Sequence, residues 1–76
     1  MNQRQREALG IARRFLGQRA FVRVSEDGHC VVGRAEMLIS GQRYEREFGR
    51  GSTWVVALQR AREGYQQFRA KAGKAA

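Results

Sequence analysis

The chain is poor in several residue types, and each shortage excludes a class of protein. Its 76 residues include no proline, a single cysteine and a single histidine. One cysteine, Cys30, cannot form an intramolecular disulfide, which excludes a disulfide-stapled secreted scaffold. No segment approaches the ~18 apolar residues that cross a bilayer, and the first residues lack the apolar run of a signal peptide. We therefore expect a cytoplasmic protein that does not enter a membrane.

Histidine and cysteine are also too few to support a metal centre. Zinc sites normally use four ligands, and His29 and Cys30 are the only residues of their kinds. The two are neighbours on a predicted strand, where adjacent side chains point to opposite faces and cannot share a proton as base and nucleophile. A nuclease built on the histidine with Glu26 or Asp27 is the remaining catalytic alternative, although this acidic pair is typical of a turn. We therefore expect no metal, no cofactor and no enzyme activity.

Arginine is what the chain has in excess. Thirteen arginines and two lysines stand against seven acidic residues, which gives a formal net charge of +8. Self-repulsion at this charge has a free-energy cost that a purely structural domain has no need to accept. Guanidinium groups donate forked pairs of hydrogen bonds that fit phosphate and carboxylate groups. A GC-rich genome would explain the preference for arginine over lysine but not the net charge, so we expect an anionic partner: nucleic acid, or an acidic protein or nucleoprotein surface.

Hydrophobic periodicity predicts a helix followed by three strands. Residues 3–17 place their apolar side chains on one arc of a helical wheel and arginines on the opposite arc. Alternating sequence rich in β-formers predicts strands at 20–25, 29–39 and 42–48. Asp27-Gly28 and Ser40-Gly41 lie between the strands and favour tight turns, so the strands form two successive hairpins.

A second helix closes the predicted fold. Ser52 or Thr53 can cap its start, and we expect it to run to about Ala70. Its apolar residues recur four, three, four and three positions apart, which makes one stripe for the core: Trp54, Leu58, Ala61, Tyr65 and Phe68. The order α-β-β-β-α predicts a single α+β domain over residues 1–70, in which both helices pack on one face of a three-stranded antiparallel meander.

This arrangement leaves one sheet face and the last residues without a structural partner. The face away from the helices is open to water, to a partner or to a second copy, so the fold is compatible with a homodimer. Residues 71–76 contain two lysines among small residues. We expect them to form a flexible basic tail.

Several spacings in this order resemble the double-stranded-RNA-binding domain. His29 lies twelve residues before the turn glycine Gly41, Tyr44 follows three residues later, and residues 49–52 form a glycine-serine segment before the last helix. In that family a histidine-bearing loop, a turn, an aromatic residue in a strand and a glycine-serine segment follow in the same order. The resemblance implies the α-β-β-β-α fold and RNA contacts at the outer face of the first helix, at His29 and at the start of the last helix.

The last helix departs from this family pattern. The family opens the helix with Lys-Lys-x-Ala-Lys, whereas this chain keeps the alanine and has three apolar residues in place of the lysines: Trp54, Val55 and Leu58. Apolar side chains cannot neutralise phosphates, so the groups left for RNA here are Arg50, Ser52 and the free N–H groups of the helix start. Divergent members of the family are protein-interaction modules, which is the second function that the resemblance implies.

Six residues are candidates for binding a partner. Three arginines lie on the outer arc of the first helix, for which the alternative interpretation is an ordinary solvated helix face. Arg50 lies between two glycines ahead of a helix start, where the backbone can form an anion-binding concavity. Charges on the second and third strands can form cross-strand ion pairs of a structural kind: Arg34, Glu36, Arg43 and Glu45. The binding candidates are therefore Arg6, Arg13, Arg14, His29, Arg50 and Ser52.

Charge, size and fold together predict a non-enzymatic basic binding module. It would act on nucleic acid or on a nucleoprotein complex through arginine contacts to an anionic surface. The alternative is a small phage-type inhibitor of the anti-CRISPR class, which docks on an acidic surface of a protein or of a CRISPR effector complex and blocks its DNA binding. The chain resembles such proteins in its size, its single domain and its lack of a catalytic set.

Overall fold

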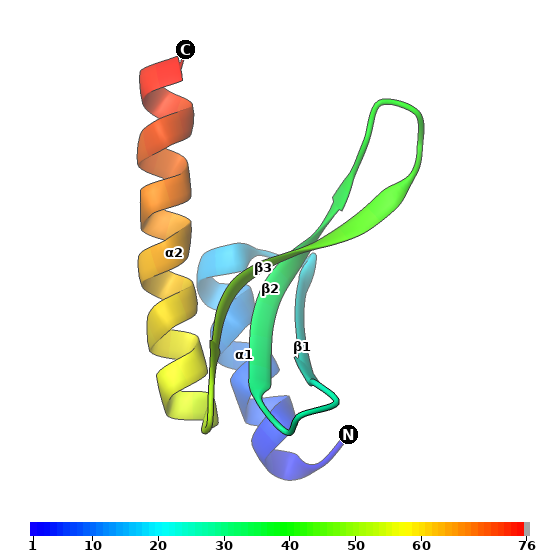
Figure 1. Cartoon of the computed structure of the whole chain (residues 1–76), viewed down its shortest axis with the longest axis vertical. Coiled ribbons are helices and arrows are strands. Elements are labelled where there is room, and N and C mark those ends of the chain that lie inside the picture. Colours follow the sequence, from blue (N-terminus) through cyan, green and yellow to red (C-terminus); the bar gives the residue numbers. More distant parts are fainter. Residues whose placement is uncertain (76) are drawn as a thin grey trace.

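The computed structural model describes residues 1–75, with side chains as far as residue 73, and contains the five expected elements in the expected order. The α+β prediction is confirmed, and Figure 1 shows the arrangement. The elements are α1 (Gln3–Leu16), β1 (Ala20–Val24), β2 (Cys30–Met37), β3 (Arg43–Gly51) and α2 (Trp54–Ala75).

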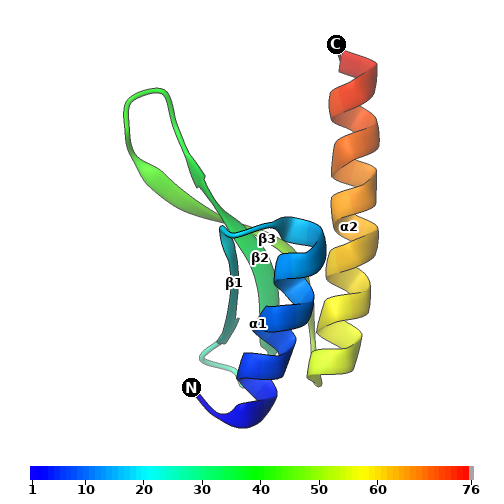
Figure 2. The same ribbon diagram turned by 180° about the vertical axis from the view of Figure 1, so that it is seen from behind.

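The three strands form one antiparallel sheet in the order β1-β2-β3. β1 pairs with β2 from Ala20↔Arg34 to Val24↔Cys30, and the β2–β3 register shifts between Val32 and Gly33. Both helices cover the same face of this sheet, as the two opposite views in Figures 1 and 2 show. The expected meander with its helices on one side is therefore confirmed.

Local signals at both ends define α1. The Asn2 side chain accepts a hydrogen bond of 2.8 Å from the Gln5 backbone N–H, and the Gln5 side chain accepts one of 3.4 Å from the Asn2 backbone N–H, which forms a capping box. At the other end Gly17 has φ +85°, a conformation that favours glycine, and its N–H donates to the Arg13 carbonyl. The buried side of the helix consists of small and aliphatic side chains: Ala8, Ala12 and Leu16.

Two glycines in β3 allow α2 to lie directly against the sheet. A β-carbon at Gly49 would overlap the backbone of Ala61, and one at Gly51 would lie 2.6 Å from a Val56 methyl group. The predicted strand ended at residue 48, and that boundary is wrong because β3 continues to Gly51. The glycine pattern that is typical of a turn marks a close approach of helix and strand here.

The apolar stripe of α2 packs as its spacing predicts. Ala57 and Ala61 are fully buried, and larger residues of the stripe pack around the core cluster. Phe48 meets Tyr65 and Phe68 edge-on, with ring centroids 5.4 and 5.5 Å apart. These aromatic contacts extend the core toward the C-terminal half of α2.

The far end of α2 differs from the prediction. The helix was expected to end near Ala70, but it continues to Ala75. The segment predicted as a flexible tail, residues 71–76, is therefore helical as far as Ala75, while residue 76 lies outside the described residues.

Candidate functional site

The outer face of α1 presents three exposed arginines. Arg13 and Arg14 lie seven and eight residues after Arg6, so the three project from the same side of the helix. Among the described side chains no ion pair involves any of the three, and the one hydrogen bond recorded for them is from Arg6 Nη2 to the Met1 carbonyl, at 3.3 Å. This face therefore holds cations whose donors remain available to a partner.

An exposed glycine lies in the middle of that face. Gly10 is one turn from Arg6 on one side and from Arg13 and Arg14 on the other, and a β-carbon built on it would meet nothing within 4 Å. A glycine inside a helix costs up to ~1 kcal/mol relative to alanine. Because no packing contact within the chain requires this glycine, the face has a bare backbone between its arginines.

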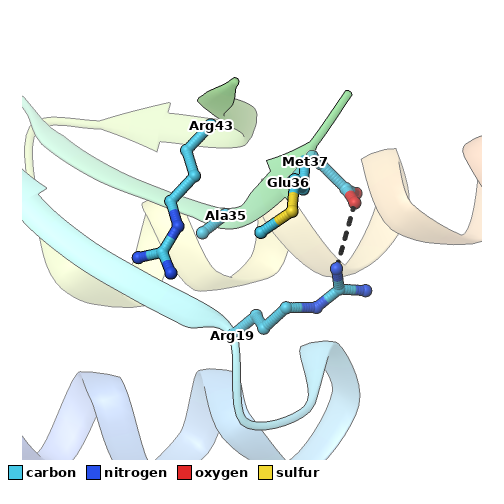
Figure 3. Close-up of a pocket in the computed structure, with 5 residues that line it drawn as sticks. All are labelled: Arg19, Ala35, Glu36, Met37 and Arg43. Atoms are coloured by element: carbon cyan, nitrogen blue, oxygen red, sulfur yellow. Dashed lines mark ion pairs between the residues drawn. The ribbon is translucent and has the colours of Figure 1, made fainter. Parts of the chain in front are cut away.

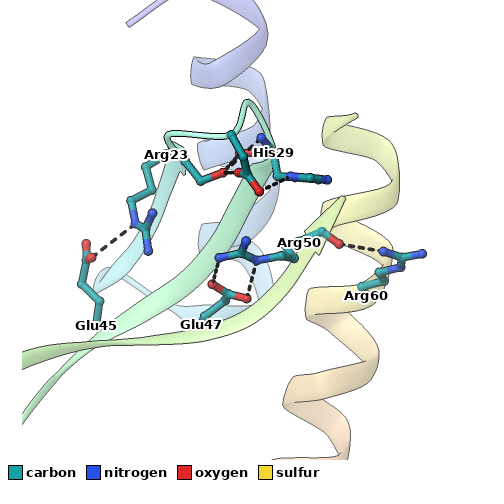
Figure 4. Close-up of polar contacts among 8 residues, drawn as sticks. Arg23, His29, Glu45, Glu47, Arg50 and Arg60 are labelled. Carbon is teal, nitrogen blue, oxygen red and sulfur yellow. Dashed lines mark hydrogen bonds and ion pairs between the residues drawn. The ribbon is translucent and has the colours of Figure 1, made fainter. Parts of the chain in front are cut away.

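Arg50 forms an ion pair and does not line an anion-binding concavity. Its Nε and Nη2 donate to the two oxygens of Glu47 at 2.9 and 2.8 Å, a bidentate pair shown in Figure 4. Hydrogen bonding to Arg50 lowers the pKa of Glu47, and the same bond raises the pKa of Arg50. Arg50 lies in β3, so its side chain is not in the segment ahead of the helix where the concavity was expected.

The neighbouring charges on this sheet face are paired as well. Arg23 on β1 lies 3.4 Å from Glu45 on β3, so this pair spans the whole sheet. Arg23 and Arg50 flank Val31 in the strand register, and Val31 is fully buried although no helix covers it. The aliphatic parts of the two arginines therefore shield an apolar residue on the open face.

His29 belongs to a hydrogen-bonded turn between β1 and β2. The Ser25 hydroxyl donates to the Asp27 carboxylate and accepts from the His29 backbone N–H at 3.1 Å. Nδ1 of His29 lies 2.9 Å from Oδ2 of Asp27, close enough for an ion pair once the ring is protonated. Hydrogen bonds from Ser25 and then from His29 hold the pKa of Asp27 well below its usual range. The hydroxyl is bonded to the carboxylate and to the backbone of His29, so these contacts close the turn.

Thr53 is the cap of α2. Its Oγ1 accepts a hydrogen bond of 3.3 Å from the Val56 N–H, which resolves the choice that the sequence left open. Ser52 is exposed in the connection just before it. Nearby, Nη1 of Arg60 donates to the Arg50 carbonyl at 3.0 Å, which ties α2 to the end of β3 (Figure 4).

The six candidates do not form one surface. The buried side chain of Cys30 faces the helices, so the adjacent residues His29 and Val31 face the other way. Arg50 is paired with Val31 and shares that open face. The three arginines of α1 lie opposite the buried side of that helix, which faces the sheet, so they point away from the open sheet face.

Sequence reasoning named Glu36 only as one of four strand charges, but this carboxylate lies within ion-pair distance of three arginines. The Glu36 side chain is only 14% exposed and lies 2.6 Å from Arg34, 3.7 Å from Arg19 and 3.8 Å from Arg46. Arg34 is equally buried and donates to the Tyr65 hydroxyl at 3.3 Å. Arg34 and Glu36 pair along β2, while the expected cross-strand pairing of Glu36 and Glu45 takes place with Arg46 and Arg23. Arg34 and Glu36 lie two and four residues after the buried Val32, and this alternation was the available signal that both side chains face the helices.

The β2–β3 turn carries exposed apolar side chains beside a small pocket. Ile39 is fully exposed, and Met37 and Leu38 are about half exposed, at 56% and 47%. A pocket of about 220 Å³ at the base of the turn is shown in Figure 3 and is lined by Arg19, Ala35, Glu36, Met37 and Arg43. Among the described side chains no ion pair involves Arg43.

A second hollow lies between the N-terminal parts of the helices. It measures about 300 Å³ and is mostly apolar, with residues from both helices in its wall: Arg4, Glu7, Ala8, Ile11, Thr53, Trp54, Val55 and Leu58. Val55 is 76% exposed here and Ile11 36%. This groove is the apolar neighbour of the α1 arginines.

Within residues 1–75, no three metal-binding side chains of the His, Cys, Asp or Glu kind lie close enough to hold an ion. Neither helix, over the same residues, has the length and apolar character needed to cross a membrane. No family model, no curated protein and no solved structure matches this chain. The element order is compatible with the resemblance to the double-stranded-RNA-binding domain, and membership of that family stays a prediction.

Proposed function

We propose that this protein is a non-enzymatic nucleic-acid-binding module whose main contact surface is the outer face of α1. The observation that carries the proposal is the difference in pairing among the arginines. Arg6, Arg13 and Arg14 are exposed and have no carboxylate partner among the described side chains, whereas Arg23 and Arg50 on the sheet are paired. A cation with no internal partner binds phosphate without first breaking an ion pair.

The spacing of the three arginines fits a duplex groove. At ~1.5 Å of rise per residue, Arg6 and Arg13 lie about 10 Å apart along the helix axis. This separation is comparable to the width of a nucleic-acid groove, which is about 6–12 Å in B-form DNA. The arginines can therefore contact phosphates on both sides of one groove, with Gly10 between them.

The remaining candidates have a smaller share in this proposal. Arg50 would have to leave Glu47 to bind phosphate, and His29 lies beside the ionised Asp27, which repels an anionic partner. Ser52 is exposed and remains available as a neutral hydrogen-bond donor. We expect these three residues to contribute less than the arginines of α1.

The test is the salt dependence of binding to three labelled probes: duplex DNA, duplex RNA and a single strand. Each phosphate neutralised contributes a slope of about −0.7 to −0.9 in log K against log salt concentration, so three arginines give a slope of roughly −2 to −3. Arg13→Glu should weaken binding more than tenfold at low salt. Arg60→Glu makes the same charge change on α2, near the end of β3, and serves as the control.

Two results would contradict the proposal. One is a flat salt dependence, and the other is equal loss of binding in Arg13→Glu and Arg60→Glu, which would show that net charge alone matters. Arg50→Glu adds a further comparison, because the proposal expects it to disturb the sheet more than the binding.

A second candidate function is docking on an acidic protein or nucleoprotein surface, as an inhibitor of the anti-CRISPR class would do. The apolar groove between the helices favours it, because Ile11 and Val55 are exposed beside Arg4. Protein interfaces combine such an apolar centre with a charged rim. Failure to bind any nucleic acid near physiological salt, together with capture of a protein partner that Val55→Glu abolishes, would favour this function over the first.

A further inference from the structure

The β2–β3 hairpin extends beyond the rest of the sheet as a two-stranded arm. β1 begins at Ala20, which pairs with Arg34, so β2 continues past this point with β3 as its only neighbouring strand. Figures 1 and 2 show this part of the hairpin bending away from both helices. At ~3.3 Å per residue, the three strand residues from Ala35 to Met37 extend about 10 Å from the body, and the turn lies beyond them.

The tip of the arm is apolar where a surface turn is normally polar. Met37, Leu38 and Ile39 are consecutive, and each exposes about half of its surface or more. Isolated apolar residues on a surface need no explanation, but a run at the end of a projecting element points to a partner. The turn itself is well formed, since the Leu38 N–H donates to the Gln42 carbonyl and the Gly41 N–H to the Leu38 carbonyl, both at 2.8 Å.

The charges on the arm favour an anionic partner. Its two carboxylates are already engaged, Glu36 with Arg34 and Glu45 with Arg23. Arg43, at the end of β3 nearest the tip, has no ion-pair partner among the described side chains. The tip therefore combines an apolar point with an available guanidinium group.

The base of the arm is held to the body. Nη2 of Arg46 donates to the Tyr44 hydroxyl at 2.9 Å, and its guanidinium carbon lies 4.8 Å from the centre of the Phe68 ring of α2. Glu36 joins the same cluster through Arg34. Because its base is fixed to the body, the arm can bend a molecule that its tip enters.

We propose that this hairpin is a DNA-bending arm, whose tip inserts Ile39 between base pairs from the minor groove of double-stranded DNA while Arg43 contacts the adjoining phosphates. The inference rests on the proposed nucleic-acid function and specifies its substrate. Apolar wedges of this kind partly unstack a base step and kink the duplex by about 20–90°. The reach of the arm exceeds the depth of the minor groove, which is about 7.5 Å.

The geometry favours B-form DNA over duplex RNA. Two strands about 4.8 Å apart fill a minor groove about 6 Å wide, so deeper entry widens the groove and bends the helix. The minor groove of RNA is wide and shallow, which gives a wedge no walls to push against. Flexible pyrimidine–purine steps such as TA are the least costly places for the tip to enter.

The experiment uses the full chain and a DNA duplex of about 30 base pairs with a central TA step, labelled at its ends with a donor and an acceptor dye. The wild-type protein should raise energy transfer as the duplex bends. Ile39→Ser should remove that rise and weaken binding about tenfold, the loss expected when a buried aliphatic contact is removed. Its thermal unfolding should match the wild type, because Ile39 is fully exposed in the free protein.

Val24→Ser is the matched control, since Val24 is another exposed aliphatic residue but pairs with Cys30, at the end of the sheet away from the arm. It should bend and bind DNA as the wild type does. The inference is overturned if the wild type binds the duplex with the expected salt slope but does not bend it, or if Ile39→Ser bends it equally well. Either result leaves the α1 surface intact, whereas the absence of any duplex binding across the salt range overturns the proposed function along with this inference.

Discussion

Helix α1 and the sheet both carry arginines, but they differ in whether these arginines form ion pairs. Arg23, Arg34, Arg46 and Arg50 on the strands each lie within ion-pair distance of a glutamate of the sheet. The outward arginines of α1 have no such partner among the described side chains. Net charge therefore says little about where an anion would bind, because five of the thirteen arginines form ion pairs among the described side chains. Local pairing separates these from the arginines that remain available.

The sheet charges are paired within the fold, whereas the helix charges are the ones that we propose to bind a partner. Arg34 shows the structural role most clearly, since its guanidinium lies 5.3–5.8 Å from the centres of three aromatic rings and contacts Glu36. Cation–π contacts and a buried ion pair hold it in place. Three substitutions sharpen or break the division of roles, and they follow in order of expected effect.

Glu36→Gln should have the largest effect on stability. It leaves the Arg34 side chain, which is 14% exposed, without its carboxylate, and we expect a loss of about 2–3 kcal/mol, just below the ~3–5 kcal/mol for breaking a fully buried pair. Thermal unfolding followed by circular dichroism should shift down by at least 8 °C, since ~1 kcal/mol corresponds to about 4–8 °C in a domain of this size. Unchanged unfolding would mean that the sheet arginines are not structural.

Gly10→Ala should separate stability from binding on α1. Nothing lies within 4 Å of the added methyl group, so the helix should gain up to ~1 kcal/mol. The same methyl group stands between the arginines and should hold a nucleic-acid backbone away, which weakens duplex binding. Gly73→Ala, also in open space but on α2, is the control for the effect of the methyl group itself. Tighter duplex binding by Gly10→Ala would contradict the placement of the interface.

Asp27→Asn should have the smallest effect, a loss of stability that is present above about pH 4 and disappears as the pH falls. The pKa of Asp27 is lowered in the folded state, so its ionisation contributes stability above the unfolded value of about 3.9, and this contribution is lost as the pH falls through the folded value. The wild type should therefore lose stability below about pH 4, and the variant should lose less. Melting temperatures measured from pH 6 to pH 2 test this, and parallel curves would show that the turn does not contribute.

Much of the fold could be predicted because its signals are local. The apolar arc of α1, the glycines at the two turns and the stripe on α2 each depend on a few neighbouring positions. Gly49 and Gly51 misled the prediction because glycine serves two purposes, a turn or a close approach, and only the position of α2 distinguishes them. The end of α2 was misplaced because small residues with lysines are compatible with both helix and tail.

The candidate site was less predictable, because pairing between charges depends on tertiary geometry. The α1 arginines could be placed on an outer face from helical period alone. Arg50 could not be assigned, since its bond to Glu47 depends on both residues lying in one strand that the prediction ended too early. The apolar tip at Leu38 and Ile39 was assigned to a strand, so its exposure on a projecting turn was not foreseen.

β1 begins at Ala20 and does not cover the part of β2 beyond Arg34, which affects how the chain behaves in concentrated solution. Past Ala35 the outer edge of β2 has backbone groups that no described strand satisfies, and such an edge is a template for adding a strand from another molecule. Arg19 and Arg43 line the pocket beside this edge, as Figure 3 shows. A second copy that paired with this edge would bring like charges together. We therefore expect these two arginines to disfavour edge-to-edge aggregation.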